Sequence, residues 1–393
     1  MNAIDKRALV IGGSLAGLFA GTLLRSMGWQ VDIYERSPHN LDSRGGGIVL
    51  QPDVVEAFQR AGIAYEDPLG VVAHERYYLK RDGSIAQAMP MRQTLTSWNL
   101  LYGSMRRHFP ADHYHQGKHL TEIQQDGLAV TAMFADGTHE TGDLLVGADG
   151  PTSTIRHLLL PDYTPQYAGY VAYRGLVNES ELDLATAKLL TERFVFYQFS
   201  NSHILQYVIP GENESLIPGE RRFNWVWYVN YNQTTELPDI LTDKNGQQRE
   251  YSIAPGMIHP TVEQAMRSYA DRVLAPPFQK LVAATQEPFV QAILDLGVPQ
   301  MAFGHASVAE QPRIALIGDA AFIPRPHTAA STAKAAANAI ALVDALVDSN
   351  HDVPKALEAW EGDQLALGMR LWKSGEALGE RSQFMYGKGR TEG

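Results

Sequence analysis

Residues 7–17 read RALVIGGSLAG, and residues 18–27, LFAGTLLRSM, follow them directly. The first five residues are an apolar run typical of a buried strand, and the second stretch has the composition of a helix that stops at Gly28. Residues 30–34 then alternate between polar and apolar side chains and lead to Glu35. A strand, a glycine-rich turn, a helix and a second strand with an acidic end predict the βαβ start of a dinucleotide-binding fold.

The backbone of such a turn decides what it binds. Its N–H groups approach a pyrophosphate, and an acidic residue about 20 positions further on accepts a ribose hydroxyl. Glu35 stands at that distance from the turn. Ser14 stands where the fingerprint has its second glycine, but a serine adds only a hydroxyl, so close approach to a ligand remains open. The alternative is a plain α/β turn that binds nothing.

Small residues dominate a second stretch, far along the chain. Residues 318–332 read GDAAFIPRPHTAAST, and residues 333–347 continue with AKAAANAIALVDALV. A proline-rich turn therefore opens into a helix whose small side chains let a flat ligand approach the backbone. The free N–H groups and the positive end of the helix dipole favour a ligand that carries or develops negative charge, such as a reducible cofactor ring. A tightly packed, alanine-rich core helix is the alternative.

A third stretch lies between these two. Residues 144–146 are an apolar run that delivers GADGPTSTIR at residues 147–156. A strand, turn and helix that carry Asp149 and Arg156 can hold a further part of a bound nucleotide. The alternative is a helix start capped by a threonine or serine hydroxyl, with an Asp–Arg surface pair that contributes little.

Composition and charge narrow the class of protein. The 393 residues suffice for two domains that share a large core, and 45% hydrophobic with 20% charged residues is ordinary globular composition. A net charge of −11 argues against nucleic acid or an anionic membrane surface as the main partner. No stretch is apolar enough to span a bilayer, and the first expected strand begins too early for a signal peptide, so we expect a cytoplasmic protein.

Two residue types exclude further chemistry. The chain has no cysteine, which excludes disulfides, thiolate metal sites, a catalytic cysteine and a cysteinyl link to a cofactor. Its 13 histidines form neither an HExxH motif nor a compact group of ligands, so we expect no metal site.

Residues 167–288 differ in composition from the rest of the chain. Runs such as YVAYRGLV, RFVFYQF and FNWVWYVNY are rich in aromatic and β-branched residues, and turn residues separate them. They predict an antiparallel sheet, which a hairpin around Asp82-Gly83 joins. One face of this sheet could cover a cofactor, or its aromatic side chains could only build a core.

The three motifs together resemble the fingerprints of the single-component flavin-dependent aromatic hydroxylases, the family of para-hydroxybenzoate hydroxylase. The motifs occur in the family's order, and the resemblance covers nearly the whole chain. It implies a mixed α/β and α+β fold, with a Rossmann-like FAD-binding domain, an antiparallel substrate-binding sheet and C-terminal helices. The implied domains are residues 1–75, 95–166 and 289–350 for FAD, residues 76–94 and 167–288 for the sheet, and residues 351–393 for a helical tail that packs on the first domain or forms a dimer contact.

The resemblance also implies a set of FAD-binding residues. Gly12, Ser14 and Gly17 approach the pyrophosphate, and Glu35 binds the adenosine ribose. Asp319 reaches the ribityl and pyrophosphate region, and the N–H groups of Thr332 and Ala333 face the flavin ring. The remaining members of the implied set are Arg36, Arg44, Gln51, Asp149 and Ala329. Many relatives have an arginine that contacts the cofactor near position 98, where this chain has Trp98.

The chemistry that the resemblance implies is aromatic hydroxylation. NADH or NADPH reduces FAD, O₂ adds at flavin C4a, and the hydroperoxide hydroxylates an electron-rich aromatic or heteroaromatic ring, such as a hydroxypyridine or a phenol. A base or strong acceptor near the flavin would take a proton from a substrate hydroxyl. His327 is the first candidate, with Pro326 facing the substrate and Tyr207 and Tyr173 as weaker candidates. His327 could instead cap the helix or bind the backbone, and we expect Arg325 to pair structurally.

Other functions stay open at this point. Trp225-Val226-Trp227 echoes the WxW element of flavin-dependent halogenases but lacks the Ile-Pro that follows it there. An epoxidase or Baeyer–Villiger enzyme for a larger polyketide or alkaloid is hardly separable from a hydroxylase by sequence. A non-catalytic flavin-binding regulator is a rival of a different class, although a regulator has no need to admit a substrate beside the ring.

Overall fold

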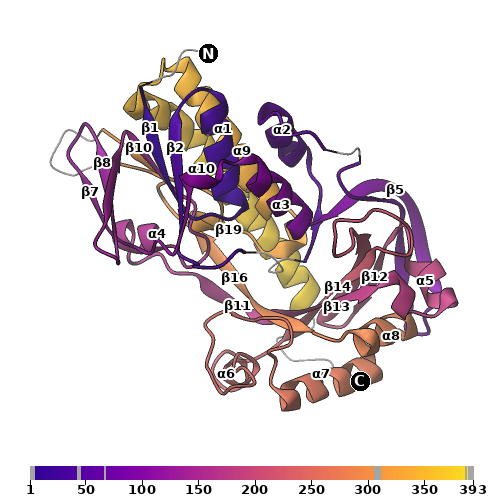
Figure 1. Ribbon diagram of the computed structural model, residues 1–393. Coiled ribbons are helices and arrows are strands. Elements are labelled where there is room, and N and C mark those ends of the chain that lie inside the picture. Colours follow the sequence, from indigo (N-terminus) through magenta and orange to yellow (C-terminus); the bar gives the residue numbers. More distant parts are fainter. Residues whose placement is uncertain (1–4, 42–45, 66–67, 305–310, 386, 388–393) are drawn as a thin grey trace.

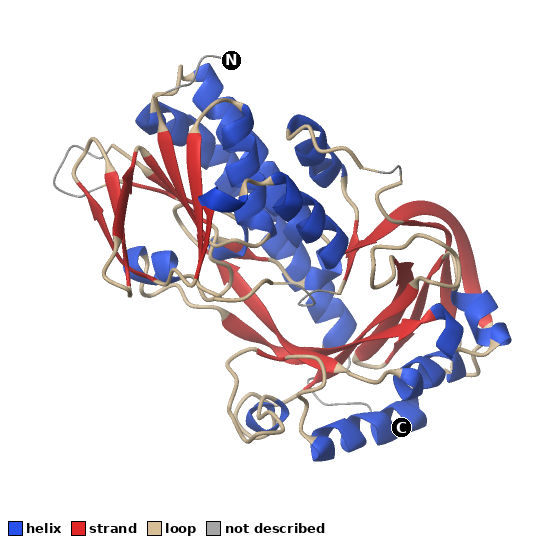
Figure 2. Cartoon of the chain, viewed as in Figure 1, coloured by secondary structure: helices blue, strands red, loops and turns tan. Residues whose placement is uncertain are grey.

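The structure is a computed structural model that describes residues 5–41, 46–65, 68–304, 311–385 and 387 (Figure 1). Two sheets of different kinds organise the chain, and Figure 2 shows one group of helices beside the first sheet and further helices below the second. The fold is mixed α/β and α+β, as the sequence predicts.

The first sheet contains the βαβ unit. Strands β1 (Arg7–Ile11) and β2 (Gln30–Glu35) pair in parallel, and helix α1 (Leu15–Ser26) connects them. The sheet order is β17-β18-β10-β1-β2-β6, with β10 (Leu144–Gly147) next to β1. Its remaining strands are β6 (Tyr114–Gln116), β17 (Ala302–Phe303) and β18 (Ile314–Leu316). Strands β1 and β10 lead into the motifs at residues 12–17 and 147–156, the first and the second in chain order, so these two motifs begin on neighbouring strands.

Three helices cover one region of this sheet. Helix α9 (Ser331–Asp348) packs against α1, and α10 (Val353–Gln383) packs against α9. Helix α9 follows the proline-rich turn, whose residues form β19 (Phe322–Ile323) and a short 3-10 turn. The small residues of α9 allow this close packing, because alanine side chains such as Ala336 and Ala339 are fully buried.

The second sheet is larger, with the order β15-β16-β11-β14-β13-β12-β4-β5-β3 along its main path. Its central strands are β11 (Gln166–Asn178), β12 (Arg193–Phe199), β13 (Ser202–Ile209), β14 (Arg222–Asn230) and β16 (Phe289–Gly297). Its edge strands are β3 (Gly47–Val49) and β15 (Ser252–Ile253), and β4 (Val71–Leu79) and β5 (Ile85–Ser97) lie between β12 and β3. The N-terminal part of the chain thus gives β3, β4 and β5 to this sheet.

One pair in this sheet departs from the antiparallel expectation, because β12 and β4 are parallel. The two strands come from distant parts of the chain, so no hairpin imposes an antiparallel arrangement on them. All other pairs along its path are antiparallel.

The two faces of the large sheet have different partners. Trp225, Trp227 and Tyr173 point to the face that helices α7 (Pro260–Val273) and α8 (Pro276–Ala284) cover, and all three are buried in that core. Residues of the opposite parity point to the other face, and there the apolar side chains form clusters of their own. We call this second face the near face, because Ala329 of the proline-rich turn packs against it.

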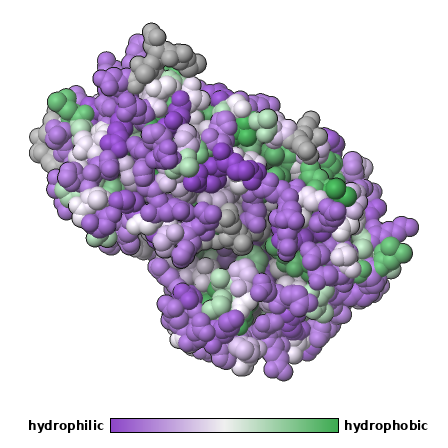
Figure 3. Space-filling model, in the orientation of Figure 1, coloured by the Kyte–Doolittle hydropathy of each residue, from purple (hydrophilic) through white to green (hydrophobic). Residues whose placement is uncertain are grey.

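A third sheet and five further helices complete the described part of the chain. A small sheet consists of β7 (Leu120–Gln125), β8 (Val130–Phe134) and β9 (His139–Gly142). The other helices are α2 (Pro52–Arg60), α3 (Trp98–His108), α4 (Thr154–Leu159), α5 (Leu184–Leu190) and α6 (Leu237–Ile240). The surface in Figure 3 is mostly hydrophilic, and within the described ranges no helix combines the length and apolarity that a membrane span needs.

Candidate active site

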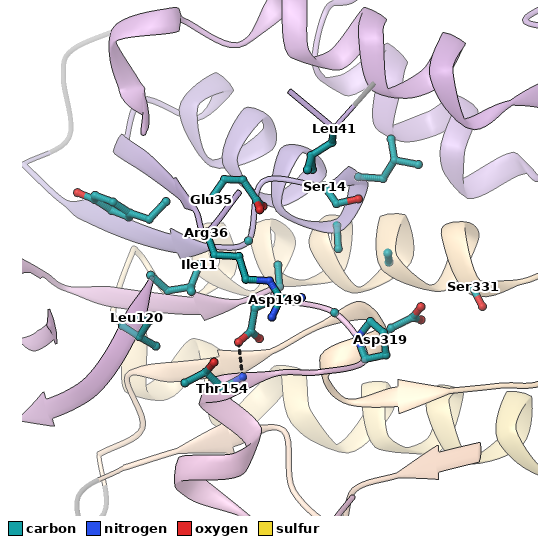
Figure 4. A pocket seen from close by; sticks show the side chains of 18 of the residues that line it. Ile11, Ser14, Glu35, Arg36, Leu41, Leu120, Asp149, Thr154, Asp319 and Ser331 are labelled. Carbon is teal, nitrogen blue, oxygen red and sulfur yellow. Dashed lines mark hydrogen bonds between the residues drawn. The ribbon is translucent and has the colours of Figure 1, made fainter. Parts of the chain in front are cut away.

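A cavity of about 450 Å³ lies where the three sequence motifs meet. Figure 4 shows Ser14 and Glu35 from the first motif, Asp149 from the second and Asp319 with Ser331 from the third around one space. The volume lies in the range of ligand and cofactor pockets. Stretches separated by more than a hundred residues thus contribute to one site.

The fingerprint turn is built from close backbone contacts. Gly12 has a φ of +106°, and a Cβ at this position would overlap the backbone of Ala148. A Cβ at Gly17 would overlap the carbonyl of Gly12. Gly12 and Ser14 line the cavity, whereas Gly17 does not, so Gly17 serves the packing of α1 against the turn.

Glu35 holds the same turn from β2. Its two carboxylate oxygens accept hydrogen bonds of 2.8 Å from the backbone N–H groups of Gly13 and Ser37. The side chain is buried and lines the cavity, so its remaining lone pairs can accept a hydroxyl. Arg36, also in the lining, donates a 2.9 Å hydrogen bond to the hydroxyl of Thr152 and so connects the first motif with the second.

Asp149 presents a polar atom without a protein partner. Its Oδ2 accepts hydrogen bonds from the N–H groups of Thr154 (2.7 Å) and Ile155 (3.3 Å), whereas Oδ1 is buried and has no partner. Burial raises the pKa of this carboxyl group. A buried acceptor in the lining of a cavity indicates a ligand that donates a hydrogen bond there.

Arg156 has a structural role. It is buried, and it donates hydrogen bonds to the carbonyls of Ala320 (2.9 Å) and Tyr163 (3.1 Å). Ser153 caps its helix by accepting a 2.9 Å hydrogen bond from the Arg156 N–H. Arg156 does not line the cavity. Its guanidinium instead connects the motif at residues 147–156 to Ala320 of the motif that begins at Gly318.

The third motif presents the start of α9 to the cavity. Ser331 and Thr332 line it, as does Asp319 from the preceding turn. Ala333 is buried one position further and does not line the cavity. Ala329 has a φ of +51°, in the left-handed region, and packs on the near face of the large sheet.

Three other expected residues lie elsewhere. Gln51 precedes α2 as its N-cap and is absent from the cavity lining, and Arg44 lies outside the described residues. Trp98 lines the cavity and stacks on Tyr102 with ring centroids 4.4 Å apart. The aromatic ring of Trp98 is thus part of the lining of the site.

His327 lies in a group of aromatic side chains on the near face. Its Nε2 is 2.8 Å from the hydroxyl of Tyr170, and the rings of Tyr228 and His203 have centroids 4.7 and 5.2 Å from its own. Burial lowers the pKa of His327 well below its usual value, and the neighbouring His203 and Arg325 lower it further. His327 is therefore a neutral imidazole that hydrogen-bonds a phenol, rather than a helix cap.

A second polar group on the near face surrounds the start of β3. An added Cβ at Gly47 would overlap the ring of Tyr207, and Asn224 Oδ1 accepts a 2.9 Å hydrogen bond from the Gly47 N–H. Asn224 Nδ2 and Arg174 Nε are buried without hydrogen-bond partners. Burial raises the pKa of the Tyr207 phenol, which stays protonated.

Sequence reasoning missed Arg174 and Asn224, and it misplaced Tyr173. Arg174 and Asn224 each interrupt an apolar strand with a polar residue on one face, a signal that the alternation of β11 and β14 contains. Tyr173 neighbours Arg174 and therefore points to the opposite face, where its hydroxyl lies 3.0 Å from that of Tyr231. Tyr173 thus lies on the far face of the sheet, whereas Tyr207, the other tyrosine candidate, lies on the near face.

The WxW element of the sequence belongs to the same far face. The indole N–H of Trp225 donates a 2.8 Å hydrogen bond to the hydroxyl of Thr285, and that of Trp227 donates a 3.0 Å bond to Ser202. Both indole rings are fully buried in the protein core, so packing explains the two tryptophans that resemble a halogenase motif.

Arg325 pairs structurally, as expected. It donates hydrogen bonds to both carboxylate oxygens of Asp295, the shortest 2.7 Å, and one of 3.2 Å to Glu380 of α10. The guanidinium also lies over the ring of Tyr170. This network holds the turn that carries His327.

Comparison with known proteins agrees with this geometry. A family model described as FAD binding domain-like matches residues 167–295. The 2,6-dihydroxypyridine 3-monooxygenase of Paenarthrobacter nicotinovorans is 33% identical over 98% of this chain and 93% of its own length. The 6-hydroxynicotinate 3-monooxygenase of Pseudomonas fluorescens is 28% identical over 89% of this chain and 86% of its own length.

Solved structures resemble the whole chain. The 2,6-dihydroxypyridine-3-hydroxylase from Arthrobacter nicotinovorans matches with a TM-score of 0.88 and 32% identity, covering 97% of this chain and 94% of that one. Klebsiella pneumoniae HpxO, complexed with FAD and uric acid, has a TM-score of 0.77 at 22% identity, which shows a common fold. With one third of its residues identical to such a hydroxylase over nearly the full length of both proteins, and with three motifs around one dinucleotide-sized cavity, the chain belongs to the FAD-dependent aromatic monooxygenases.

Proposed function

We propose that this protein hydroxylates a hydroxypyridine ring, with NADH or NADPH and O₂ as co-substrates. The observation that carries the proposal is the near face of the large sheet. On this face lie the neutral imidazole of His327 and two buried nitrogen atoms without hydrogen-bond partners, Arg174 Nε and Asn224 Nδ2. The same face of the sheet meets the part of the chain that binds FAD. The two curated relatives act, by their names, on hydroxylated pyridines, which supports this substrate class.

The FAD-binding roles are part of the proposal. Ser14 and Gly12 lie against the pyrophosphate, and Glu35 accepts a hydroxyl of the adenosine ribose. Asp149 Oδ1, the buried acceptor without a partner, takes a further hydroxyl or N–H group of the cofactor. The N-terminus of α9 faces the ring system, because Ser331 and Thr332 line the cavity and their end of the helix is positive.

Bound FAD supplies the activated oxygen, and the protein positions and prepares the ring. We assign the proton of the substrate hydroxyl to the imidazole of His327, at the ring nitrogen that does not face Tyr170, while the Tyr170 hydroxyl holds the imidazole at Nε2. His327 suits this task because burial keeps it unprotonated near neutral pH. Removal of this proton makes the ring electron-rich at the carbon that is attacked.

Arg174, Asn224 and Tyr207 hold the substrate in this proposal. Arg174 Nε and Asn224 Nδ2 are donors without partners, and the protonated Tyr207 phenol is a third donor nearby. Three donors fit a ring that carries oxygen substituents and becomes anionic during the reaction. Pro326, next to His327 in the same turn, is assigned to shape the pocket rather than to transfer a proton.

A substrate screen tests the proposal. 2,6-Dihydroxypyridine, 6-hydroxynicotinate and salicylate are each added to the FAD-loaded protein, and consumption of NADH and NADPH is compared with formation of hydroxylated product. We expect a hydroxypyridine to give product in proportion to the nucleotide oxidised. If every hydroxypyridine causes oxidation of NADH or NADPH that yields only hydrogen peroxide, the proposed substrate class is wrong. Hydroxylated product from a large polyketide would assign the enzyme to that substrate class instead.

The assembly and the compartment are separate proposals. Leu378 of α10 and Met385 after it are exposed apolar side chains, which supports a homodimer through the C-terminal helix. Light scattering of the purified protein measures the assembly, and a monomeric mass at micromolar concentration contradicts the dimer. The lack of cysteine agrees with a reducing compartment and supports a cytoplasmic location, which fractionation of the host cell tests.

A further inference from the structure

Lys334 is a buried cation in an unfavourable place. It lies in the first turn of α9, where the helix dipole disfavours positive charge, and only 1% of its side chain is exposed. A buried charge persists when a partner compensates its loss of hydration. Burial lowers the pKa of Lys334, whereas Asp319 raises it. A cation kept at such a position calls for an explanation beyond packing.

The partners of Lys334 belong to the cofactor site. Its ammonium group donates a 2.9 Å hydrogen bond to Asp319 Oδ1 and a second hydrogen bond to the carbonyl of Phe322. Asn338, one helical turn further on, accepts a 3.0 Å hydrogen bond from the N–H of Gly318. Lys334 and Asn338, which lie on one face of α9, therefore hold Asp319 and Gly318 in place through these hydrogen bonds.

Asp319 is the exposed end of this arrangement. Its side chain is 37% exposed and lines the cavity, and its neighbour Gly318 lies against Ala16 after the fingerprint turn. A bare carboxylate at this place would repel the pyrophosphate of a dinucleotide and the negative charge that a reduced flavin carries. The same carboxylate is useful as an acceptor for a cofactor hydroxyl. The site thus needs the oxygen atoms of Asp319 as hydrogen-bond acceptors, while the negative charge of the carboxylate has to be neutralised.

We propose that Lys334 is a positioning residue that orients Asp319 and cancels its charge, so that anionic FAD can bind against a carboxylate acceptor. The inference rests on the proposed contact between Asp319 and the cofactor. It concerns FAD binding and not the aromatic substrate, so its failure can be told apart from a failure of the substrate assignment.

A double-mutant cycle tests this role. The variants Lys334→Met, Asp319→Asn and the combination of both are prepared without flavin, and the dissociation constant of FAD is measured by flavin fluorescence. We expect Lys334→Met to weaken FAD binding by about tenfold or more, a size typical of charges a few ångströms apart in a protein. Asp319→Asn in the Lys334→Met background restores most of that loss, because no unpaired carboxylate remains.

The midpoint potential of bound FAD gives a second readout. Loss of the cation in Lys334→Met leaves a negative charge near the reduced flavin and lowers the potential. Asp319→Asn leaves the cation alone and raises the potential, and the double variant lies near the wild-type value. Opposite signs for the two single variants are not expected if Lys334 only supports the fold.

Three further variants serve as controls. Lys334→Arg keeps the charge and is expected to bind FAD within about threefold of wild type, since a guanidinium still reaches a carboxylate. Lys355 pairs with Asp352 at the surface with 74% of its side chain exposed, so Lys355→Met should leave FAD binding unchanged. Lys334→Gln removes the charge but keeps donors, and it replaces Met in the cycle if Lys334→Met does not fold.

Two outcomes overturn the proposal. One is an FAD dissociation constant in Lys334→Met, or in Lys334→Gln, that equals the wild-type value. The other is a loss of affinity that Asp319→Asn does not restore while the potential stays unchanged, which means that Lys334 only supports the turn.

Discussion

The Nε2 atom of His327 lies 2.8 Å from the hydroxyl oxygen of Tyr170. His327 belongs to the proline-rich turn before α9, and Tyr170 belongs to strand β11. This hydrogen bond therefore joins the turn before α9 to the large sheet. Tyr170 is fully buried, and Arg325 lies over its ring. The pair is thus held from both sides, which fixes the position of the imidazole.

Replacement of His327 by glutamine is expected to reduce turnover by about 10² or more, the range of a lost general base, while FAD stays bound. Tyr170→Phe removes only the hydroxyl and should reduce turnover less. Stopped-flow measurement of product formation, with the flavin spectrum recorded in parallel, separates the two effects. Tyr173→Phe is the matched control, because that hydroxyl lies on the far face of the same strand. Equal turnover in His327→Gln and wild type removes His327 from the mechanism.

The pH dependence of stability follows from His203. This histidine is buried, and burial lowers its pKa from 6.5 to about 4. Between pH 6.5 and pH 4 the unfolded chain binds a proton that the folded protein does not, so the free energy of unfolding falls as the pH falls through this window. The shift corresponds to about 3 kcal/mol in total. Above pH 6.5 His203 contributes no slope.

Urea unfolding at several pH values measures this slope. His203→Asn keeps an acceptor for the side-chain amide of Gln383, whose nitrogen lies 3.1 Å from His203 Nδ1, but cannot be protonated. The variant is expected to lose less stability than wild type between pH 6.5 and pH 4. An identical slope in both proteins would assign the acid sensitivity to other groups, His327 first among them.

The meeting of the three motifs around one cavity could be predicted from sequence because its determinants are local. Gly12, Ser14 and Glu35 act through a turn and a strand end that follow each other in the chain, so spacing alone places them together. Asp319 follows from the same kind of reasoning about a strand end and a helix start. Gly17 was assigned to the ligand although its missing Cβ serves the contact with Gly12, a distinction that needs the packing of α1.

The polar group of Arg174 and Asn224 could not be predicted in the same way, because its assembly depends on strand register. Arg174 and Asn224 lie on strands β11 and β14, and only the pairing of these strands brings both to the loop at Gly47. A shift by one residue would have placed Tyr173 there instead of Arg174. Sequence gives the alternation of such strands but not which face meets the cofactor.

The role of Gly17 gives a prediction about folding and FAD binding together. Gly17→Ala forces α1 away from the fingerprint turn, since the added methyl would overlap the Gly12 carbonyl. We expect destabilisation of about 1–3 kcal/mol, as for overpacking, together with a weaker affinity for FAD. Gly362→Ala in α10 is the control: nothing lies near its Cβ position, so it should be neutral or stabilise by up to about 1 kcal/mol. Thermal unfolding measures the stability of both variants, and titration with FAD measures their affinity for the cofactor.

The Arg325 network gives a prediction that separates a buried ion pair from an exposed one on the same guanidinium. The side chains of Arg325 and Asp295 are 4% and 13% exposed, whereas that of Glu380 is 53% exposed. Arg325→Met leaves the Asp295 carboxylate buried and unpaired, which is expected to cost about 3–5 kcal/mol and to slow turnover, because the next residues carry His327.

Glu380→Gln should cost less than about 1 kcal/mol, because water screens an exposed pair. Glu376→Gln, an exposed glutamate one turn earlier on α10, is its control. Denaturant unfolding gives the stabilities, and the ratio of product to oxidised nucleotide shows whether the turn still presents His327. If Arg325→Met and Glu380→Gln destabilise the protein equally, α10 rather than β16 holds the turn, and the C-terminal helix becomes the element on which the position of His327 depends.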